Sequence, residues 1–200
     1  MRIAIIGAGV VGSALARAFY AAGHSVVLSG RHPDRAATVA AEIGADAVED
    51  KREAVTGADV VVLAVPSTAI AGLCDRISGA VGGKIVLDPT NPFLPDLSGL
   101  LPADASVAEE ITVLLPDTVV VKAFNTVLGK RITDPVVDGV RLDGLYAGDD
   151  EAAKATVSGL IDALGLDPVD AGDLDASRRQ EPGTPVYGAD LNAADARAAL

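Results

Sequence analysis

Residues 1–35, MRIAIIGAGVVGSALARAFYAAGHSVVLSGRHPDR, carry the strongest structural signal in this chain. The short apolar run 2–6 predicts a buried parallel strand. A glycine-rich turn follows it, and apolar residues at helical spacing then predict a helix that ends at Gly23. Residues 25–28 predict a second strand. Strand, glycine turn, helix and strand together form the βαβ unit of a Rossmann-type, doubly wound α/β fold with a mainly parallel sheet.

The glycine-rich turn has the pattern G-x-G-x-x-G, formed by Gly7, Gly9 and Gly12. In a dinucleotide site, Gly7 permits the tight turn, Gly9 lets the backbone approach a pyrophosphate, and Gly12 lets the helix pack closely on the strand. The free N–H groups at the start of the following helix favour a phosphate. The alternative is a purely structural turn, because glycine turns are common.

The end of the second predicted strand indicates which dinucleotide binds. An NAD-selective site places an acid here, to bind the ribose hydroxyls. This chain instead has Ser29 and Gly30, followed by the basic cluster Arg31, His32 and Arg35. A hydroxyl and two guanidinium groups suit a 2′-phosphate, which a carboxylate would repel. We therefore expect NADP(H) rather than NAD(H), the alternative being that the arginines only solvate a loop.

Composition limits the classes of partner. The chain has 200 residues, of which 50% are hydrophobic, and a formal net charge of −12. That charge argues against nucleic acid and anionic membranes as partners. The single cysteine, Cys74, rules out an intramolecular disulfide or a cysteine-based metal cluster, so we expect no metal. Without a recognisable signal peptide or a run long enough to span a bilayer, the expected location is the cytoplasm.

Three further apolar runs predict buried strands, at residues 59–65, 84–87 and 118–122. Each is followed by a turn that contains proline or polar residues. In an open parallel sheet, ligands lie beyond the carboxyl ends of the strands. Ala64, Val65, Pro66 and Ser67 are therefore expected to line the nicotinamide side of the site, the alternative being that Val-Pro merely ends a strand. Asn91 is expected on the same side, where its amide could meet a carboxamide or a ribose. Phe124 could stack on a ring or belong to the core.

We expect an NADP-binding domain at residues 1–127 and a small α/β extension, packed on the same sheet, at 128–200. A helix is predicted at 102–115. Residues 128–143 are hard to interpret and suggest a helix and a loop. The alanine-rich tail 189–200 is helical by propensity, with little to anchor it.

Several motifs occur together in the order typical of one family. They are GAGVVGSALA at 7–16, SGRHPDRA at 29–36, AVP at 64–66, NPF at 91–93, VVKAFNT at 120–126, AGDDEAAK at 147–154 and GLDPVDAGDLDASRRQEP at 165–182. The chain resembles the NADPH-dependent reductases of coenzyme F420, a deazaflavin, and the wider set of NADP-binding oxidoreductases around them. The resemblance covers residues 1–182, and the VVKAFNT and VDAGDLDASR stretches are much more specific than the glycine loop.

The resemblance implies direct hydride exchange between NADP(H) and a deazaflavin or flavin, with no catalytic acid or base. The residues that carry over are Gly7, Ala8, Gly9, Val10, Val11 and Gly12 at the pyrophosphate, Ser29, Arg31 and Arg35 at the 2′-phosphate, and Ala64, Pro66, Asn91 and Ala123 at the nicotinamide. Family members continue past the SR-xx-E element with a long apolar helix that helps enclose the second cofactor or build a dimer. Here Glu181 is followed by a short polar tail, so a homodimer is left open.

Two other functions remain. The first is an NADPH-dependent reductase of a small carbonyl or imine, which needs a proton donor; Lys122 is the only candidate at a strand end. The second is a non-catalytic NADP(H)-binding sensor. The fold alone does not choose among these functions.

Overall fold

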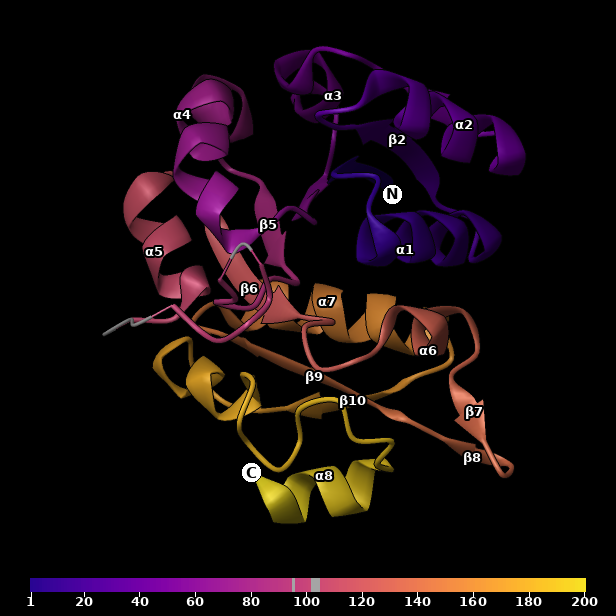
Figure 1. The fold of residues 1–200 in the computed structure, drawn as a ribbon, viewed down its shortest axis with the longest axis vertical. Helices are drawn as coiled ribbons and strands as arrows, with labels where there is room; N and C mark the ends of the chain where they lie inside the picture. Colours follow the sequence, from indigo (N-terminus) through magenta and orange to yellow (C-terminus); the bar gives the residue numbers. More distant parts are fainter. Residues whose placement is uncertain (95, 102–104) are drawn as a thin grey trace.

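The computed structural model describes residues 1–94, 96–101 and 105–200. Its centre is an eight-stranded sheet with the order β10-β9-β6-β5-β4-β1-β2-β3 (Figure 1). The strands are β1 (Arg2–Ile6), β2 (Ser25–Ser29), β3 (Asp46–Ala47), β4 (Val60–Leu63), β5 (Ile85–Asp88), β6 (Val119–Ala123), β9 (Asp143–Gly148) and β10 (Asp167–Asp170). All neighbouring strands pair in parallel except β6 and β9. The predicted doubly wound, mainly parallel α/β fold is confirmed.

Helices cover both faces of the sheet. The helices are α1 (Val10–Ala21), α2 (Pro33–Ile43), α3 (Lys51–Thr56), α4 (Ile70–Val81), α5 (Val107–Leu114), α6 (Gly129–Thr133), α7 (Glu151–Ala163) and α8 (Ala193–Ala199), with 3-10 turns η1 (Ser67–Ala69) and η2 (Asp175–Gln180). Helices α1, α2 and α7 pack on one face, and α3, α4 and α5 pack on the other. β7 (Val136–Val137) and β8 (Val140–Arg141) form a separate hairpin.

The pattern of β1 explains why a continuous apolar run forms a strand here. Ile3 and Ile5 contribute to one core, while Ala4 and Ile6 contribute to the core on the opposite face. Side chains alternate across a strand, so a strand covered on both faces needs apolar residues at every position. Burial on both sides thereby fixes β1 at the centre of the sheet, with its carboxyl end at the glycine turn.

Two predicted segments have different boundaries. The helix expected at 102–115 is α5, which begins at Val107 because Ser106 and Glu109 form a capping box. The expectation at 102–104 falls outside the described residues. Residues 128–143 contain the expected helix, α6, and the β7–β8 hairpin takes the place of the expected loop.

The carboxyl-terminal tail differs most from expectation. The 3-10 turn η2 leads into this tail. The tail is anchored: Val186 and Ala196 are buried against Leu145 and Val169 of β9 and β10. The prediction that little holds the tail was therefore wrong, because Leu191, Ala193, Ala199 and Leu200 also pack against this cluster. The division into domains at 127/128 stays a prediction, since β9 and β10 continue the same sheet as β6.

Candidate functional site

The glycine loop and the carboxyl ends of β4, β5 and β6 surround a cleft of about 560 Å³. Its lining is mostly apolar and consists of Gly9, Val10, Val11, Ala64, Val65, Pro66, Ser67, Pro89, Thr90, Asn91, Phe93, Leu94, Leu97, Phe124, Asn125, Thr126, Val127, Leu128, Gly129 and Tyr187. Since parallel strands bring their carboxyl ends to one edge, residues more than a hundred positions apart meet here.

The structure gives a different reason for glycine at each of the three positions of the loop. Gly7 has a φ of +120°, and a Cβ on it would lie 2.0 Å from the Ala64 carbonyl oxygen. A Cβ on Gly12 would lie 1.9 Å from the Gly7 carbonyl oxygen. A Cβ on Gly9 would meet nothing within 4 Å. Gly7 and Gly12 are therefore required by the fold, whereas Gly9 leaves open space beside the start of α1.

The start of α1 is suited to an anion. Gly9 is the N-terminal cap residue and supplies no side-chain hydrogen bond to the first helical N–H groups. These groups and the helix dipole favour a phosphate. The open space at Gly9 lets such a group approach the backbone, so the loop fits the pyrophosphate of a dinucleotide.

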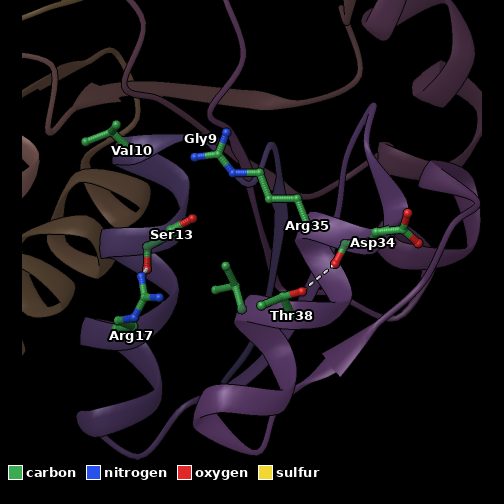
Figure 2. A pocket seen from close by; sticks show the side chains of 8 residues that line it. Gly9, Val10, Ser13, Arg17, Asp34, Arg35 and Thr38 are labelled. Atoms are coloured by element: carbon green, nitrogen blue, oxygen red, sulfur yellow. Dashed lines mark hydrogen bonds between the residues drawn. The ribbon is translucent and has the colours of Figure 1, made fainter.

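A second hollow of about 620 Å³ adjoins the glycine loop between α1 and α2. Arg35 and Arg17 line it from opposite sides (Figure 2). Arg17 donates to the Ser13 carbonyl oxygen at 3.2 Å and forms an ion pair with Glu42. No residue in the described part of the chain forms an ion pair with Arg35. Arg35 is thus the better placed of the two to hold an anionic ligand.

The end of β2 brings together only part of the predicted phosphate cluster. Arg31 and His32 are exposed, and Arg31 Nε lies 3.3 Å from His32 Nε2. Ser29 is fully buried, and its hydroxyl donates to the Glu49 carbonyl oxygen. The arginine and histidine side chains therefore reach solvent at this strand end, while the serine hydroxyl lies beneath them.

Lys51 is a further cation at this strand end that the sequence analysis did not identify. Its ammonium group donates to the Gly30 carbonyl oxygen at 3.2 Å. Lys51 begins α3, 21 positions after Gly30, so the fold rather than the local sequence brings the two residues together.

At the other end of the cleft, Ala64, Val65, Pro66 and Asn91 all belong to the lining. Ala123 does not: it is fully buried in the core at the end of β6. The residues after it line the cleft instead, namely Phe124, Asn125, Thr126 and Val127. The chain turns at Phe124, which has a φ of +64°.

Phe124 belongs mainly to the core. It is 1% exposed and packs edge-to-face on Phe19 of α1, with ring centroids 5.9 Å apart. Its ring therefore fixes the end of β6 against α1 and forms part of the floor of the cleft.

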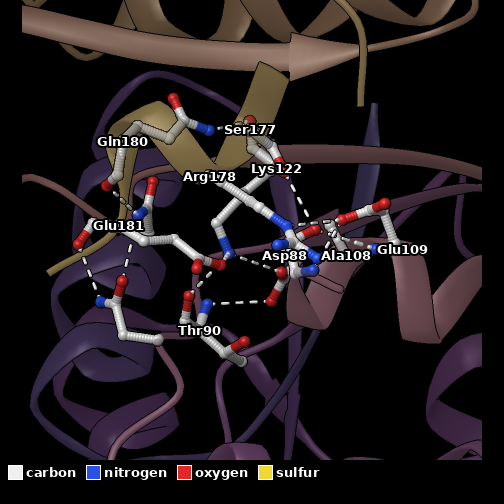
Figure 3. Close-up of polar contacts among 12 residues, drawn as sticks. Asp88, Thr90, Ala108, Glu109, Lys122, Ser177, Arg178, Gln180 and Glu181 are labelled. Carbon is white, nitrogen blue, oxygen red and sulfur yellow. Dashed lines mark hydrogen bonds and ion pairs between the residues drawn. The ribbon is translucent and has the colours of Figure 1, made fainter. Parts of the chain in front are cut away.

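Lys122, the one strand-end candidate for a proton donor, does not present its ammonium group to the cleft. Its side chain is fully buried beneath the floor. The ammonium lies 3.2 Å from Asp88 Oδ2, 3.0 Å from the Thr90 carbonyl oxygen and 3.2 Å from Glu181 Oε1 (Figure 3). Two hydrogen bonds, to Asp88 and Thr90, and the ion pair with Glu181 hold the ammonium in this position.

The mouth of the cleft carries exposed apolar side chains, including Leu97 at 72% and Leu128 at 47% exposure. Phe93 and Tyr187 pack edge-to-face beside them, with ring centroids 6.2 Å apart. Burial raises the pKa of Tyr187, so its hydroxyl stays protonated at neutral pH. Sequence reasoning missed Tyr187, because it lies in the tail that differs from the family pattern.

Within residues 1–94, 96–101 and 105–200, no three His, Cys, Asp or Glu side chains gather in a way that could hold a metal ion. Across the same ranges, no helix is long and apolar enough to cross a membrane.

Known proteins share this arrangement. Residues 2–92 match the family described as NADP oxidoreductase, coenzyme F420-dependent. A solved structure of a hypothetical protein from Sinorhizobium meliloti is 36% identical, with a TM-score of 0.85, and the match covers 96% of this chain and 95% of that one.

Two curated relatives have names that state an activity. Metalloreductase STEAP3 of Rattus norvegicus is 33% identical over 90% of this chain, which spans only 36% of that relative's length. The F420-dependent NADP reductase of Methanothermobacter marburgensis is 30% identical over 203 residues, covering 93% of this chain and 90% of that protein. With the glycine loop, the sheet and this near full-length match together, the chain belongs to the F420-dependent NADP reductase family of NADP oxidoreductases.

Proposed function

We propose that this protein transfers a hydride between NADPH and a planar ring acceptor, either the deazaflavin coenzyme F420 or a flavin. The observation that carries the proposal is the single cleft in which the glycine loop meets three strand ends and an apolar mouth. A dinucleotide on the glycine loop would extend its nicotinamide toward Ala64, Pro66 and Asn91. The mouth formed by Phe93, Leu97 and Tyr187 suits a second ring.

The chemistry of the lining supports direct transfer. Among the described lining residues, Tyr187 is the only one with a titratable side chain. Hydride exchange between two rings needs positioning rather than an acid or base in the protein. NADPH loses one hydride and becomes NADP⁺, while the acceptor ring gains that hydride and takes a proton from solvent. The side chains hold the two rings together and exclude water between them.

The cations at the end of β2 support NADP(H) over NAD(H). Arg31 at this strand end and Arg35 in the first turn of α2 are exposed, and the Lys51 ammonium donates to the Gly30 carbonyl oxygen. These groups would bind a 2′-phosphate by charge-assisted hydrogen bonds. The exposed, flexible side chains can close around the phosphate without a change in the backbone.

The deciding experiment follows NADPH oxidation optically with oxidised F420, with flavin mononucleotide as a second acceptor, at low and high salt. Wild-type protein is compared with Gly9→Val, which fills the space at the glycine loop. Turnover of F420 by wild type alone supports the proposal. Tight NADPH binding without reduction of either acceptor would indicate a non-catalytic sensor instead.

One observation favours a second function, the reduction of a small carbonyl or imine. The protonated Tyr187 hydroxyl lies in the cleft and could donate the proton that such a reaction requires. Tyr187→Phe would abolish that activity but leave transfer between two rings within about threefold, because only the first reaction uses the proton.

A further inference from the structure

Beneath the floor of the cleft, three charged groups from distant parts of the chain are buried together. Lys122 and Asp88 are fully buried, and the Glu181 side chain is 14% exposed. We call these three residues the ion triad. Burying charged groups costs free energy unless they are paired and hydrogen-bonded. A buried cluster of this kind therefore indicates a structural or functional role for the groups that it holds.

The ion triad leads directly to the cleft. Thr90 lines the cleft. Its N–H donates to Asp88 Oδ1, and its carbonyl oxygen accepts from the Lys122 ammonium. On the tail side, Gln180 precedes Glu181 and donates its amide to the Lys122 carbonyl oxygen at 3.4 Å. The Gln180 carbonyl oxygen then accepts from Asn125 Nδ2 at 2.6 Å. The triad thus fixes the strand ends and the tail around Asn125.

The orientation of the Asn125 amide follows from chemistry. The Gln180 backbone carbonyl can only accept, so the Asn125 atom that faces it must be the nitrogen. The same nitrogen lies 3.1 Å from Asn91 Oδ1, and Asn91 Nδ2 donates in turn to the Asn125 carbonyl oxygen at 3.0 Å. Two backbone carbonyls therefore determine both amides, and neither can be flipped without losing a hydrogen bond.

This orientation leaves one acceptor unused. Asn125 is 5% exposed and belongs to the cleft lining, yet its Oδ1 has no hydrogen-bond partner among the described residues. A buried unpaired acceptor costs about 1–3 kcal/mol, and such groups are rare unless they have a use. A hydrogen-bond donor on a bound ligand would remove this cost.

We propose that Asn125 Oδ1 accepts a hydrogen bond from the carboxamide NH₂ of the nicotinamide, and that the ion triad positions Asn125 for it. The proposal rests on the proposed function, since it requires NADP(H) in the cleft. Asn125 is the binding residue. Lys122, Asp88 and Glu181 act through it and are positioning residues.

The test compares three ligands in direct binding measurements: NADP⁺, its 3-acetylpyridine analogue, and 2′-phospho-ADP-ribose. The analogue replaces the carboxamide NH₂ by a methyl group, and the third ligand has no nicotinamide. Wild type should bind NADP⁺ about tenfold more tightly than the analogue. Asn125→Ala should abolish that difference and leave 2′-phospho-ADP-ribose within about twofold.

Two results would overturn the assignment of Asn125. One is equal binding of NADP⁺ and the analogue by wild type. The other is a difference that survives in Asn125→Ala. If wild type binds none of the three ligands, the proposed function itself is wrong. If wild type binds them but shows no preference for NADP⁺ that depends on Asn125, only this inference is wrong.

The positioning role is tested with Glu181→Gln, which keeps the shape of the side chain and removes its charge. The preference for NADP⁺ over the analogue should fall by about threefold or more. The matched control is Glu109→Gln, whose carboxylate pairs with Arg178 of the same 3-10 turn but has no contact with Lys122. A purely structural role would weaken all three ligands equally in Glu181→Gln, and that result, or an unchanged preference, would contradict the positioning role.

Discussion

The candidate site has two halves that are built differently. The glycine-loop half consists of residues 7–12 and the end of β2, and it presents backbone N–H groups and exposed cations. The strand-end half consists of the ends of β5 and β6 with residues 180–187, and it presents side chains held by buried contacts. The first half is made within one βαβ unit. The second depends on contacts between residues 34 to 59 positions apart.

This difference has a physical consequence for mutation. In the glycine loop, mutations that affect folding and mutations that affect binding fall at different positions. An added Cβ would clash with backbone atoms at Gly7 and Gly12 but would face open space at Gly9. In the strand-end half, the same buried side chains that shape the cleft also hold the tail on the sheet. Changes there should therefore affect stability and binding together.

The largest expected effect separates two glycines of the loop. Gly12→Ala places a Cβ 1.9 Å from a backbone oxygen, so it should destabilise the protein by more than about 3 kcal/mol. A Cβ on Gly9 meets nothing within 4 Å, so Gly9→Val should fold normally but lose at least about 100-fold in NADPH affinity. Urea unfolding and NADPH titration measure the two effects. If Gly9→Val still binds NADPH, the pyrophosphate does not bind at this loop.

The next effect concerns the ion triad. Lys122→Met should lower the free energy of unfolding by about 3–5 kcal/mol, because it leaves Asp88 buried without its cation. The double variant Lys122→Met with Asp88→Asn should lose less, since the uncompensated charge is gone. Urea unfolding of both variants measures the difference.

The control for the triad is the exposed ion pair between Arg17 and Glu42. Both side chains are more than 40% exposed, so Glu42→Gln should change the free energy of unfolding by less than about 1 kcal/mol. If Lys122→Met lowers the free energy of unfolding as little as Glu42→Gln does, the buried triad contributes no more to stability than an exposed ion pair.

A smaller effect tests coenzyme selectivity at the glycine-loop half. Arg31→Glu should weaken NADPH by about 1–3 kcal/mol and NADH much less, because only NADPH carries the 2′-phosphate. The matched control is Arg197→Glu on α8, an equal change of charge at the opposite end of the molecule (Figure 1). Equal weakening of both coenzymes by Arg31→Glu would remove Arg31 from the phosphate site.

The glycine-loop half could be predicted from the sequence because its geometry is local. Gly7, Gly9 and Gly12 each have a backbone requirement that a short pattern encodes. The mainly parallel sheet also followed from continuous apolar runs, which indicate burial on both faces. The buried position of Ser29 could not be predicted, because it depends on the Glu49 carbonyl oxygen, which belongs to another segment.

The strand-end half was predicted only in outline. The sequence located a strand end near residue 123, but the left-handed turn at Phe124 puts Asn125 rather than Ala123 in the cleft. Such a turn at an aromatic residue has no sequence signature. The anchored tail was missed because its position depends on packing against β9 and β10, and Tyr187 was missed because its position depends on packing against Phe93; composition encodes neither contact.

The smallest effect tests where the protein's pH sensitivity lies. Asp143 of β9 is buried beside the tail, and burial raises the pKa of its carboxyl to about 7 from an ordinary 3.8. The folded protein then binds this proton more tightly than the unfolded chain. Stability from Asp143 is complete below about pH 4 and is lost as the pH rises toward 7.

Asp143→Asn removes this loss, so it should raise the free energy of unfolding by on the order of 2 kcal/mol at pH 8 and by much less at pH 5. Urea unfolding at the two pH values measures the change, with the exposed Asp75→Asn on α4 as control. A gain in stability seen only in Asp143→Asn, and only at high pH, would show that ionisation of the buried Asp143 carboxyl lowers the stability of the folded protein. Equal gains at both pH values would mean that the Asp143 carboxyl is ionised in the folded protein at pH 5, so that its burial does not govern the pH dependence.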